Sequence, residues 1–316
     1  MQIVFLDRDS FAPGIDFAAA RLGACTWQDY GQTAAGQVVE RLRDAEVAIT
    51  NKVRLPGEVL TQLPRLRLIA VAATGVDNID TAAARSRNIG VSNVRGYAER
   101  TVPEHVFALL FALRRNLFGY QRAARDGRWS KSPFFCLHSY PIEDLAGTTL
   151  GIIGGGTLGQ AVARMATALG MRVLMTEQRG AAPRPGRIAF EELLRHSDAV
   201  TLHVPLTPAT RHLIGAAELA LMKPGAVLVN TARGGVVDET ALLAALQSGQ
   251  LAGAAIDVLA VEPPPPDHPL LAADLPNLII TPHVAWASRQ AQQRLADEVI
   301  ENIAAFLRGE ARNRVV

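Results

Sequence analysis

The sequence predicts an α/β protein with two domains, each built on a doubly wound parallel sheet. The chain has 316 residues, which is more than one hydrophobic core usually contains. Short aliphatic and β-branched runs alternate with helical patterns, as expected for parallel sheets covered by helices. The alternation is interrupted after residue 100 and resumes near residue 148. We therefore expect two sheets.

The first hundred residues contain the strands expected for the first sheet. These strands span residues 3–6, 47–50, 68–72 and 90–92. Helical patterns lie between them, for example over residues 36–43. Thr101 and Glu104 then have the spacing of a capping box, and apolar residues follow at helical spacing. We expect this helix to open the second domain.

Residues 125–145 are rich in aromatic, proline, serine and charged residues and have no clear period. We expect a long irregular connection there, of the kind that often carries function. Six strands separated by helical patterns follow, as a doubly wound nucleotide-binding sheet requires. They span residues 149–153, 172–175, 199–202, 226–230, 254–257 and 278–281. The proline-rich run 261–267 predicts a stiff loop, and residues 289–308 a last helix.

Composition and charge exclude several classes of protein. Hydrophobic residues make up 49% and charged residues 20%, which is typical of a globular chain. The formal charge is +2 without a basic stripe, so we expect no nucleic-acid partner. Cys25 and Cys136 make no disulfide framework, and no cysteine/histidine cluster has zinc spacing, so we expect no metal. The N-terminal residues lack the features of a secretory leader and no apolar run is long enough to cross a bilayer, so we expect a cytoplasmic protein without a membrane partner.

A glycine-rich turn follows the predicted strand 149–153. Its Gly154, Gly156 and Gly159 have the G-x-G-x-x-G spacing, and a helical pattern comes next. In such a turn the glycines permit a tight bend, a close approach to a pyrophosphate and close packing of helix on strand. The alternative is an ordinary glycine-rich turn, but the strand before it and the helix after it favour dinucleotide binding.

Glu177 stands at the end of the next predicted strand. A carboxylate there can accept hydrogen bonds from the adenosine ribose hydroxyls and repel a 2′-phosphate, which favours NAD over NADP. Arg179 leaves an alternative open, because a nearby guanidinium could hold that phosphate. A solvated surface charge is the simpler interpretation of Arg179.

Three charged or titratable residues follow predicted strands of the second sheet, at the edge where doubly wound sheets bind ligands: Arg233, Glu262 and His283. Reduction of a 2-oxo acid needs a cation for the carboxylate, which an arginine fork provides. It also needs a proton donor whose pKa lies near neutral pH, which suits histidine. A neighbouring carboxylate can orient that histidine. Each residue alone has an ordinary structural explanation, but the set favours this chemistry over those explanations.

These segments together resemble the D-isomer-specific 2-hydroxyacid dehydrogenases. The resemblance rests on the glycine turn, residues 230–235, residues 257–263 and Thr281-Pro-His283, and it spans nearly the whole chain. It implies a flavodoxin-like substrate domain made of residues 1–99 and 289–316, and a Rossmann cofactor domain of residues 100–288 inserted into it. It also implies an active site in the cleft between the domains, and a homodimer.

The resemblance implies roles for single residues. Arg233 would bind substrate, His283 would be the acid/base, and Glu262 its partner. The expected substrate-binding residues are Asn51, Thr74, Gly75, Val76, Trp286 and Ser288. The expected cofactor-binding residues are Gly154, Gly156, Thr157, Leu158, Gly159, Glu177, His203, Pro205, Thr231, Ala232 and Asp257, the last receiving the nicotinamide carboxamide.

Four segments are most similar to the glycerate dehydrogenases, also called hydroxypyruvate reductases, and imply glycerate/hydroxypyruvate or glyoxylate as substrate. They are Asn51-Lys52 and residues 73–80, 129–136 and 283–288. Arg95 departs from this pattern, because such sequences usually carry proline there. A phosphoglycerate-type dehydrogenase is the main alternative, and an NAD-sensing, corepressor-like binding protein is another. Robust reduction of hydroxypyruvate would exclude the binding protein.

Overall fold

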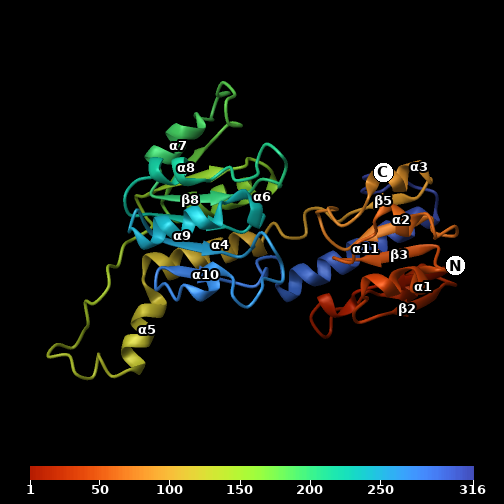
Figure 1. Ribbon diagram of the computed structural model, residues 1–316, viewed down its shortest axis with the longest axis horizontal. Coiled ribbons are helices and arrows are strands. Elements are labelled where there is room, and N and C mark those ends of the chain that lie inside the picture. The colour runs from red at the N-terminus through yellow and green to blue at the C-terminus, as the bar shows by residue number, and fades with distance from the viewer. The chain divides into compact units, whose positions relative to one another are not determined.

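The computed structural model describes residues 1–316, which divide into two compact units (Figure 1). Unit 1 consists of Met1–Ala98 together with Ala287–Val316, and unit 2 of Glu99–Trp286. Each unit contains one wholly parallel sheet with helices packed on it, so the predicted fold class is confirmed.

Unit 1 is built on a five-stranded sheet in the order β2-β1-β3-β4-β5. Its strands are β1 (Gln2–Phe5), β2 (Thr26–Asp29), β3 (Val47–Thr50), β4 (Leu68–Val71) and β5 (Gly90–Ser92). Its helices are η1 (Arg8–Ser10), η2 (Ala19–Leu22), η3 (Ala35–Gln37), α1 (Val38–Leu42), α2 (Gly57–Leu60), α3 (Thr81–Ser86) and α11 (Arg289–Leu307). This strand order is the flavodoxin-like one, in which ligands bind where the order reverses, at the carboxyl ends of β1 and β3.

Strand β2 is the one strand that the sequence pattern does not predict. It lies at the edge of the sheet and pairs only with β1. Of its four residues, only Trp27 is half-buried and the other three are exposed. The apolar runs that identify β3 and β4 come from burial on both faces, and an exposed edge strand has no such signal.

Unit 2 is built on a six-stranded sheet in the order β11-β10-β9-β8-β6-β7. Its strands are β6 (Thr149–Ile153), β7 (Arg172–Met175), β8 (Ala199–Leu202), β9 (Ala226–Asn230), β10 (Leu251–Ile256) and β11 (Leu278–Ile280). Its helices are α4 (Thr101–Arg114), α5 (Leu117–Arg125), α6 (Thr157–Ala168), α7 (Phe190–His196), α8 (Ala216–Leu221), η4 (Gly234–Val236), α9 (Glu239–Gln247) and α10 (Pro269–Ala272). The strand order reverses between β6 and β8, which makes their carboxyl ends the expected ligand site.

Helix α4 begins where the sequence predicts, but the predicted capping box does not form. Arg100 is the N-cap residue and makes no capping bond through its side chain. Thr101 is buried, and its hydroxyl donates to the carbonyl oxygen of Ala285 at 3.1 Å. The threonine is therefore used to fix the segment after β11 rather than to cap the helix.

Residues 126–148 join α5 to β6 without a helix or strand, as predicted. In Figure 1, α5 and this connection extend away from the sheet of unit 2. The longest helix is α11, and none of the helices has the length and apolar character needed to cross a membrane.

Candidate active site

The glycine turn joins β6 to α6 at the point where the strand order reverses. Gly154 has a φ of +108°, and a Cβ there would clash with the carbonyl group of His203. A Cβ on Gly159 would clash with the carbonyl oxygen of Gly154, so α6 packs directly on the turn. A Cβ on Gly156 would meet no atom within 4 Å. This open space, beside the first N–H groups of α6, is the room that a pyrophosphate needs.

His203 follows β8 and lies against the turn. Its N–H donates to the carbonyl oxygen of Ile153 at 2.7 Å, and its Nε2 lies 3.1 Å from Thr201 Oγ1. Burial lowers the pKa of the His203 imidazole to about 4, because the charged ring would lose its hydration. The ring is therefore neutral at pH 7 and cannot act as a proton donor in its charged form. Pro205 lies exposed two residues further on.

The segment after β9 contains a buried hydroxyl without a partner, Thr231 Oγ1. Asn230 is fully buried and shapes this segment, because its side chain donates to the carbonyl of Arg233 at 2.9 Å and accepts the N–H of Ala232 at 3.0 Å. Leaving a buried polar group unpaired costs about 1–3 kcal/mol, which a ligand could relieve. The unpaired Thr231 hydroxyl is therefore compatible with the predicted contact with a dinucleotide, and the contact predicted for Ala232 stays a prediction.

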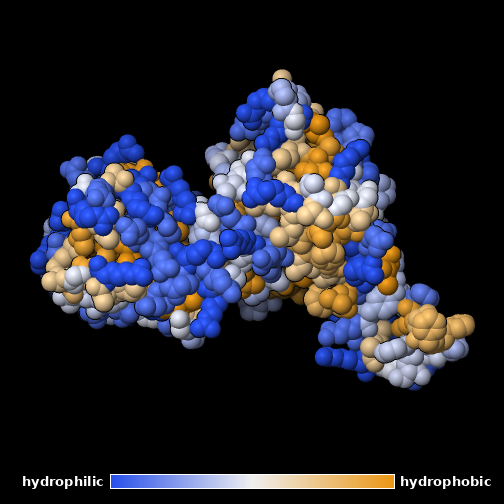
Figure 2. Space-filling view, turned by 180° about the vertical axis from the view of Figure 1, so that it is seen from behind, coloured by the Kyte–Doolittle hydropathy of each residue, from blue (hydrophilic) through white to orange (hydrophobic).

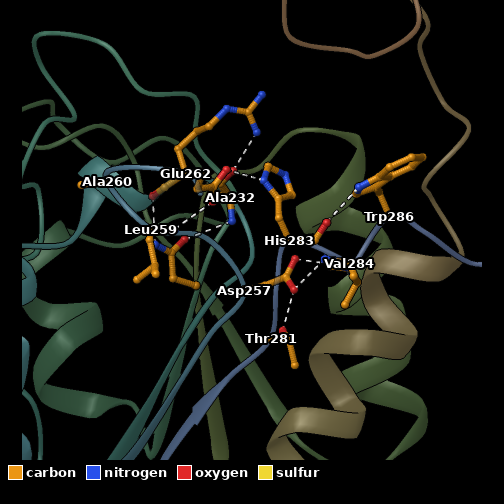
Figure 3. Close-up of polar contacts among 12 residues, drawn as sticks. Ala232, Asp257, Leu259, Ala260, Glu262, Thr281, His283, Val284 and Trp286 are labelled. Atoms are coloured by element: carbon orange, nitrogen blue, oxygen red, sulfur yellow. Dashed lines mark hydrogen bonds and ion pairs between the residues drawn. The ribbon is translucent and has the colours of Figure 1, made fainter. Parts of the chain in front are cut away.

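His283 and Glu262 form a close pair in unit 2 (Figure 3). The Nδ1 atom of His283 lies 2.7 Å from Oε2 of Glu262, whose Oε1 accepts the N–H of Leu259 at 2.9 Å. His283 has a φ of +55°, a strained conformation for a residue with a Cβ, and its carbonyl accepts the indole N–H of Trp286 at 3.0 Å. Because the carboxylate engages Nδ1, Nε2 is the ring atom that can exchange a proton with a substrate.

Asp257 holds the segment that carries His283. Its buried carboxylate accepts hydrogen bonds from Thr281 Oγ1 at 2.5 Å and from the N–H groups of Val284 and Ala285, each at 2.9 Å. Its carbonyl accepts the N–H of His283 at 2.8 Å. These bonds join the end of β10 to the end of β11 and fix the backbone of the histidine.

His105 belongs to the same cluster, and sequence reasoning missed it. Its Nε2 lies 3.1 Å from Thr281 Oγ1 and 3.6 Å from Asp257 Oδ1. Because the Thr281 hydroxyl donates to Asp257, it accepts from His105. His105 lies one helical turn after Thr101, which also contacts the segment after β11, but no feature of the sequence alone indicates this contact.

Glu177 follows β7, as predicted, and Arg184 donates to both of its carboxylate oxygens, from Nε at 2.5 Å and from Nη2 at 2.9 Å. Arg179 is engaged elsewhere. Its Nη2 lies 2.7 Å from Glu218 Oε1, and its guanidinium lies 5.5 Å from the ring centre of Phe190. The cation that pairs with Glu177 is therefore Arg184, which sequence reasoning did not consider.

In unit 1, the predicted residue Asn51 follows β3. Its N–H donates to the buried carboxylate of Asp7 at 2.8 Å, and the N–H groups of Lys52 and Val53 donate to the same carboxylate at 2.6 and 3.2 Å. Burial raises the pKa of the Asp7 carboxyl, although these N–H groups act against the rise. Asp7 therefore shapes the Asn51 loop, and the sequence pattern alone does not reveal it.

Thr74 lies in the loop after β4, followed by Gly75 and Val76. Its hydroxyl donates to the carbonyl of Val94 at 2.8 Å, and its carbonyl accepts from the side chain of Asn93 at 2.7 Å. The same Asn93 side chain accepts from Arg95 Nε at 3.3 Å. Arg95 is thus linked to the predicted substrate loop through one amide.

Ser288 is the N-cap residue of α11, and its hydroxyl oxygen accepts the N–H of Ala291 at 3.2 Å. This bond gives the residue a structural role that is independent of any substrate. Substrate binding by the predicted residues of unit 1 stays a prediction. In unit 2, by contrast, the structure brings the predicted Glu262 and His283 into direct contact.

Comparison with known proteins identifies the family. The family model described as "D-isomer specific 2-hydroxyacid dehydrogenase, NAD binding domain" matches residues 107–285. The chain is 50% identical to a glycerate dehydrogenase of Methylorubrum extorquens, covering 99% of this chain and 98% of that protein. It is 36% identical to a hydroxypyruvate reductase of Blautia hydrogenotrophica, with 100% and 99% covered. A D-lactate dehydrogenase of Aquifex aeolicus, solved with NAD and lactic acid, is 30% identical with a TM-score of 0.82, covering 98% of this chain and 96% of that chain.

The matched family segment contains the glycine turn and the residues Arg233, Glu262 and His283. The full-length relatives extend the match across both units. The chain therefore belongs to the D-isomer specific 2-hydroxyacid dehydrogenases and is an NAD-dependent oxidoreductase of D-2-hydroxy acids.

Proposed function

We propose that the protein interconverts hydroxypyruvate and D-glycerate, and also reduces glyoxylate, with NAD(H) as coenzyme. The relatives named as a glycerate dehydrogenase and a hydroxypyruvate reductase support this choice of substrate. The observation that carries the proposal is the 2.7 Å contact between His283 Nδ1 and Glu262 Oε2. Reduction of a 2-oxo acid needs a proton donor, and a histidine oriented by a carboxylate is suited to that task.

In the reductive direction, bound NADH would supply the hydride that adds to the carbonyl carbon of the 2-oxo acid. His283 delivers the proton from Nε2 to the carbonyl oxygen, while Glu262 holds Nδ1 and stabilises the protonated ring. Arg233 binds the substrate carboxylate through its planar guanidinium, and its charge also stabilises the developing alkoxide. The neutral imidazole then regains a proton from water.

The residues proposed to hold NAD lie at the glycine turn and after the carboxyl ends of β7, β8, β9 and β10. Backbone N–H groups of Thr157 and Leu158, at the start of α6, bind the pyrophosphate. Glu177 binds the adenosine ribose, and the unpartnered Thr231 hydroxyl gains a hydrogen bond. Asp257 already accepts three hydrogen bonds through its carboxylate, and such a group has about four acceptor positions, which leaves one for the nicotinamide carboxamide. His203, Pro205 and Ala232 complete the set.

The two units are proposed to divide the task. Unit 2 carries the glycine turn and the acid/base pair and serves as the cofactor domain. Unit 1 serves as the substrate domain, with Asn51 and the loop of Thr74, Gly75 and Val76 as its binding elements. The hydrogen bonds of Asp7 to the Asn51 loop and of Asn93 to Thr74 support this role, because they hold both loops in one conformation.

A homodimer is part of the proposal. Exposed large apolar side chains are concentrated between residues 111 and 142 of unit 2: Phe111, Leu117, Phe118, Trp129, Phe134, Phe135 and Ile142. Figure 2 shows apolar residues gathered at the end of the projecting connection. Exposed large apolar side chains gathered in one segment are typical of a protein interface, and a second copy of the chain is the partner we propose. The cytoplasmic location is proposed from the two free cysteines, because a reducing compartment keeps thiols unpaired.

The substrate is tested by steady-state kinetics with hydroxypyruvate, glyoxylate, pyruvate and phosphohydroxypyruvate, each with NADH. We expect the highest kcat/KM with hydroxypyruvate. A higher value with phosphohydroxypyruvate would instead make the protein a phosphoglycerate-type dehydrogenase. NADH binding without turnover of any of the four acids would overturn the proposal and favour an NAD-sensing binding role.

A further inference from the structure

Two arginines that follow Glu177 in the chain, Arg184 and Arg187, lie at the end of β7 and at the dinucleotide turn. Ile188 forms a parallel bridge with Thr176, and the N–H of Glu177 donates to the Ile188 carbonyl at 3.2 Å. This pairing places the neighbouring Arg187 beside the end of β7. The N–H of Arg187 also donates to the carbonyl of Arg184 at 2.9 Å, so a turn joins the two arginines.

Arg187 lies over the glycine turn itself. A Cβ built on Gly155 would clash with the Arg187 guanidinium, with all three of the nearest atoms belonging to that group. The guanidinium thus occupies the place that a side chain at position 155 would take. The absence of a side chain at position 155 is what lets a cation approach the turn this closely.

Arg184 contacts Glu177 from the solvent side. It donates to both carboxylate oxygens, and its own side chain is 73% exposed, whereas that of Glu177 is 12% exposed. The hydrogen bonds from Arg184, with a further electrostatic contribution from Arg187, lower the pKa of the Glu177 carboxyl. The group at the end of β7 is therefore one carboxylate with two guanidinium groups around it, and its net charge is positive.

This charge balance changes the meaning of Glu177. A lone carboxylate at this strand end repels a 2′-phosphate and selects NAD. Here the carboxylate is neutralised by Arg184, and Arg187 adds a second cation. Arg179 does not contribute, because its guanidinium is paired with Glu218 and lies against Phe190.

We propose that Arg184 and Arg187 form a binding site for the adenosine 2′-phosphate, so that the protein accepts NADPH as well as NADH. With NADH, Glu177 accepts the ribose hydroxyls and keeps its bond to Arg184. With NADPH, the exposed Arg184 side chain turns from Glu177 to the phosphate, and Arg187 binds the phosphate from the side of the turn. The inference rests on the dinucleotide site and not on the identity of the hydroxy acid.

The test compares two nucleotides that differ only in the 2′-phosphate, adenosine 2′,5′-bisphosphate and 5′-AMP, by isothermal titration of the full-length protein. We expect the bisphosphate to bind at least as tightly as 5′-AMP. Arg184→Ala and Arg187→Ala should each raise the Kd of the bisphosphate roughly tenfold, as loss of a charge-assisted hydrogen bond does. The Kd of 5′-AMP should change less than about threefold. Arg195→Ala, which removes another exposed arginine of unit 2, is the matched control and should leave both constants unchanged.

Three outcomes would overturn the proposal. The first is a wild-type protein that binds the bisphosphate at least tenfold more weakly than 5′-AMP. The second is an equal loss of affinity for both nucleotides in Arg187→Ala, which would place Arg187 at the 5′-phosphate. The third is a loss of bisphosphate binding in Arg179→Ala alone, which would move the site to that residue. Because the readout is nucleotide binding, failure of the proposed substrate in the kinetic assay leaves this test unaffected.

Discussion

His283 and Glu262 come from segments that follow neighbouring parallel strands, and their side chains meet with Nδ1 2.7 Å from Oε2. Both partners are held by backbone groups. The Leu259 N–H fixes the carboxylate, and the Asp257 carbonyl fixes the backbone of the histidine. The pair is thus oriented before any substrate arrives, as general acid–base catalysis requires. Changes to the pair should therefore affect proton transfer more than coenzyme binding.

Replacing His283 by glutamine should abolish proton delivery while preserving a polar side chain of similar length. We expect kcat for hydroxypyruvate reduction to fall by roughly 10²–10⁴, the usual contribution of a positioned general acid. The Kd for NADH, measured by fluorescence titration, should stay within about threefold of wild type. A variant that retains wild-type kcat would show that another group supplies the proton.

Glu262→Gln keeps a hydrogen-bond partner for Nδ1 but removes the negative charge. The carboxylate stabilises the charge of the protonated ring, and reduction needs that protonated ring. We therefore expect kcat for hydroxypyruvate reduction to fall by roughly tenfold or more, while the Kd for NADH stays within about threefold of wild type. Steady-state kinetics and fluorescence titration measure the two effects. A wild-type kcat in Glu262→Gln would show that the negative charge of Glu262 is not needed.

The glycine turn offers a pair of substitutions that separate stability from coenzyme binding. Gly159→Ala places a Cβ against the Gly154 carbonyl oxygen and should lower the free energy of unfolding by about 2 kcal/mol. Gly156→Ala meets no atom within 4 Å, so it should leave the free energy of unfolding nearly unchanged. It should nevertheless raise the Kd for NADH roughly tenfold, because the methyl group occupies the space of the pyrophosphate. Thermal unfolding and NADH titration of both variants measure the two effects. Unaltered NADH binding in Gly156→Ala would place the pyrophosphate elsewhere.

Hydrophobic pattern and strand–turn–helix context were enough to predict both sheets and the ends of the strands that carry the site. The bounds of β3, β8 and β9 agree with the predicted ones, and these strands are buried along their whole length. Since carboxyl ends of parallel strands share one edge, the proximity of Glu262 and His283 could also be inferred.

Contacts between distant segments could not be predicted in this way. His105 and Thr281 are 176 residues apart, and nothing in their local sequence links them. Asp7 and Asn51 are in contact although they are 44 residues apart in the chain, because each follows the end of a different strand. The pairing of Glu177 with Arg184 depends on the return of the chain beside β7, in a stretch without periodicity. Such contacts follow from the fold and not from spacing.

The pKa of His203 predicts a specific pH dependence of stability. The ring has a pKa of about 4 when folded and an ordinary value of 6.5, so the folded state favours the neutral form. Its contribution to stability is complete above about pH 6.5 and is lost as pH falls toward 4. At pH 5 the loss should reach roughly 2 kcal/mol. Urea unfolding of wild type and His203→Asn at pH 7.5 and 5.0 measures it, and the variant should lose less stability by about that amount. Equal losses in both proteins would remove His203 as the cause.

The exposed large apolar side chains between residues 111 and 142 predict the assembly state. Phe135 is 93% exposed, so its replacement by serine removes no contact within the chain and should not destabilise unit 2. In a dimer that buries this surface, Phe134→Ser combined with Phe135→Ser removes apolar contact area, and each buried phenyl ring contributes about 1.5–3 kcal/mol. We expect light scattering to give twice the chain mass of 33.8 kDa for wild type, and partial or complete dissociation of the double variant on dilution. Leu307→Ser, which changes an exposed apolar residue of unit 1, is the control and should stay dimeric. A wild-type protein that is monomeric at micromolar concentration would contradict the proposed homodimer.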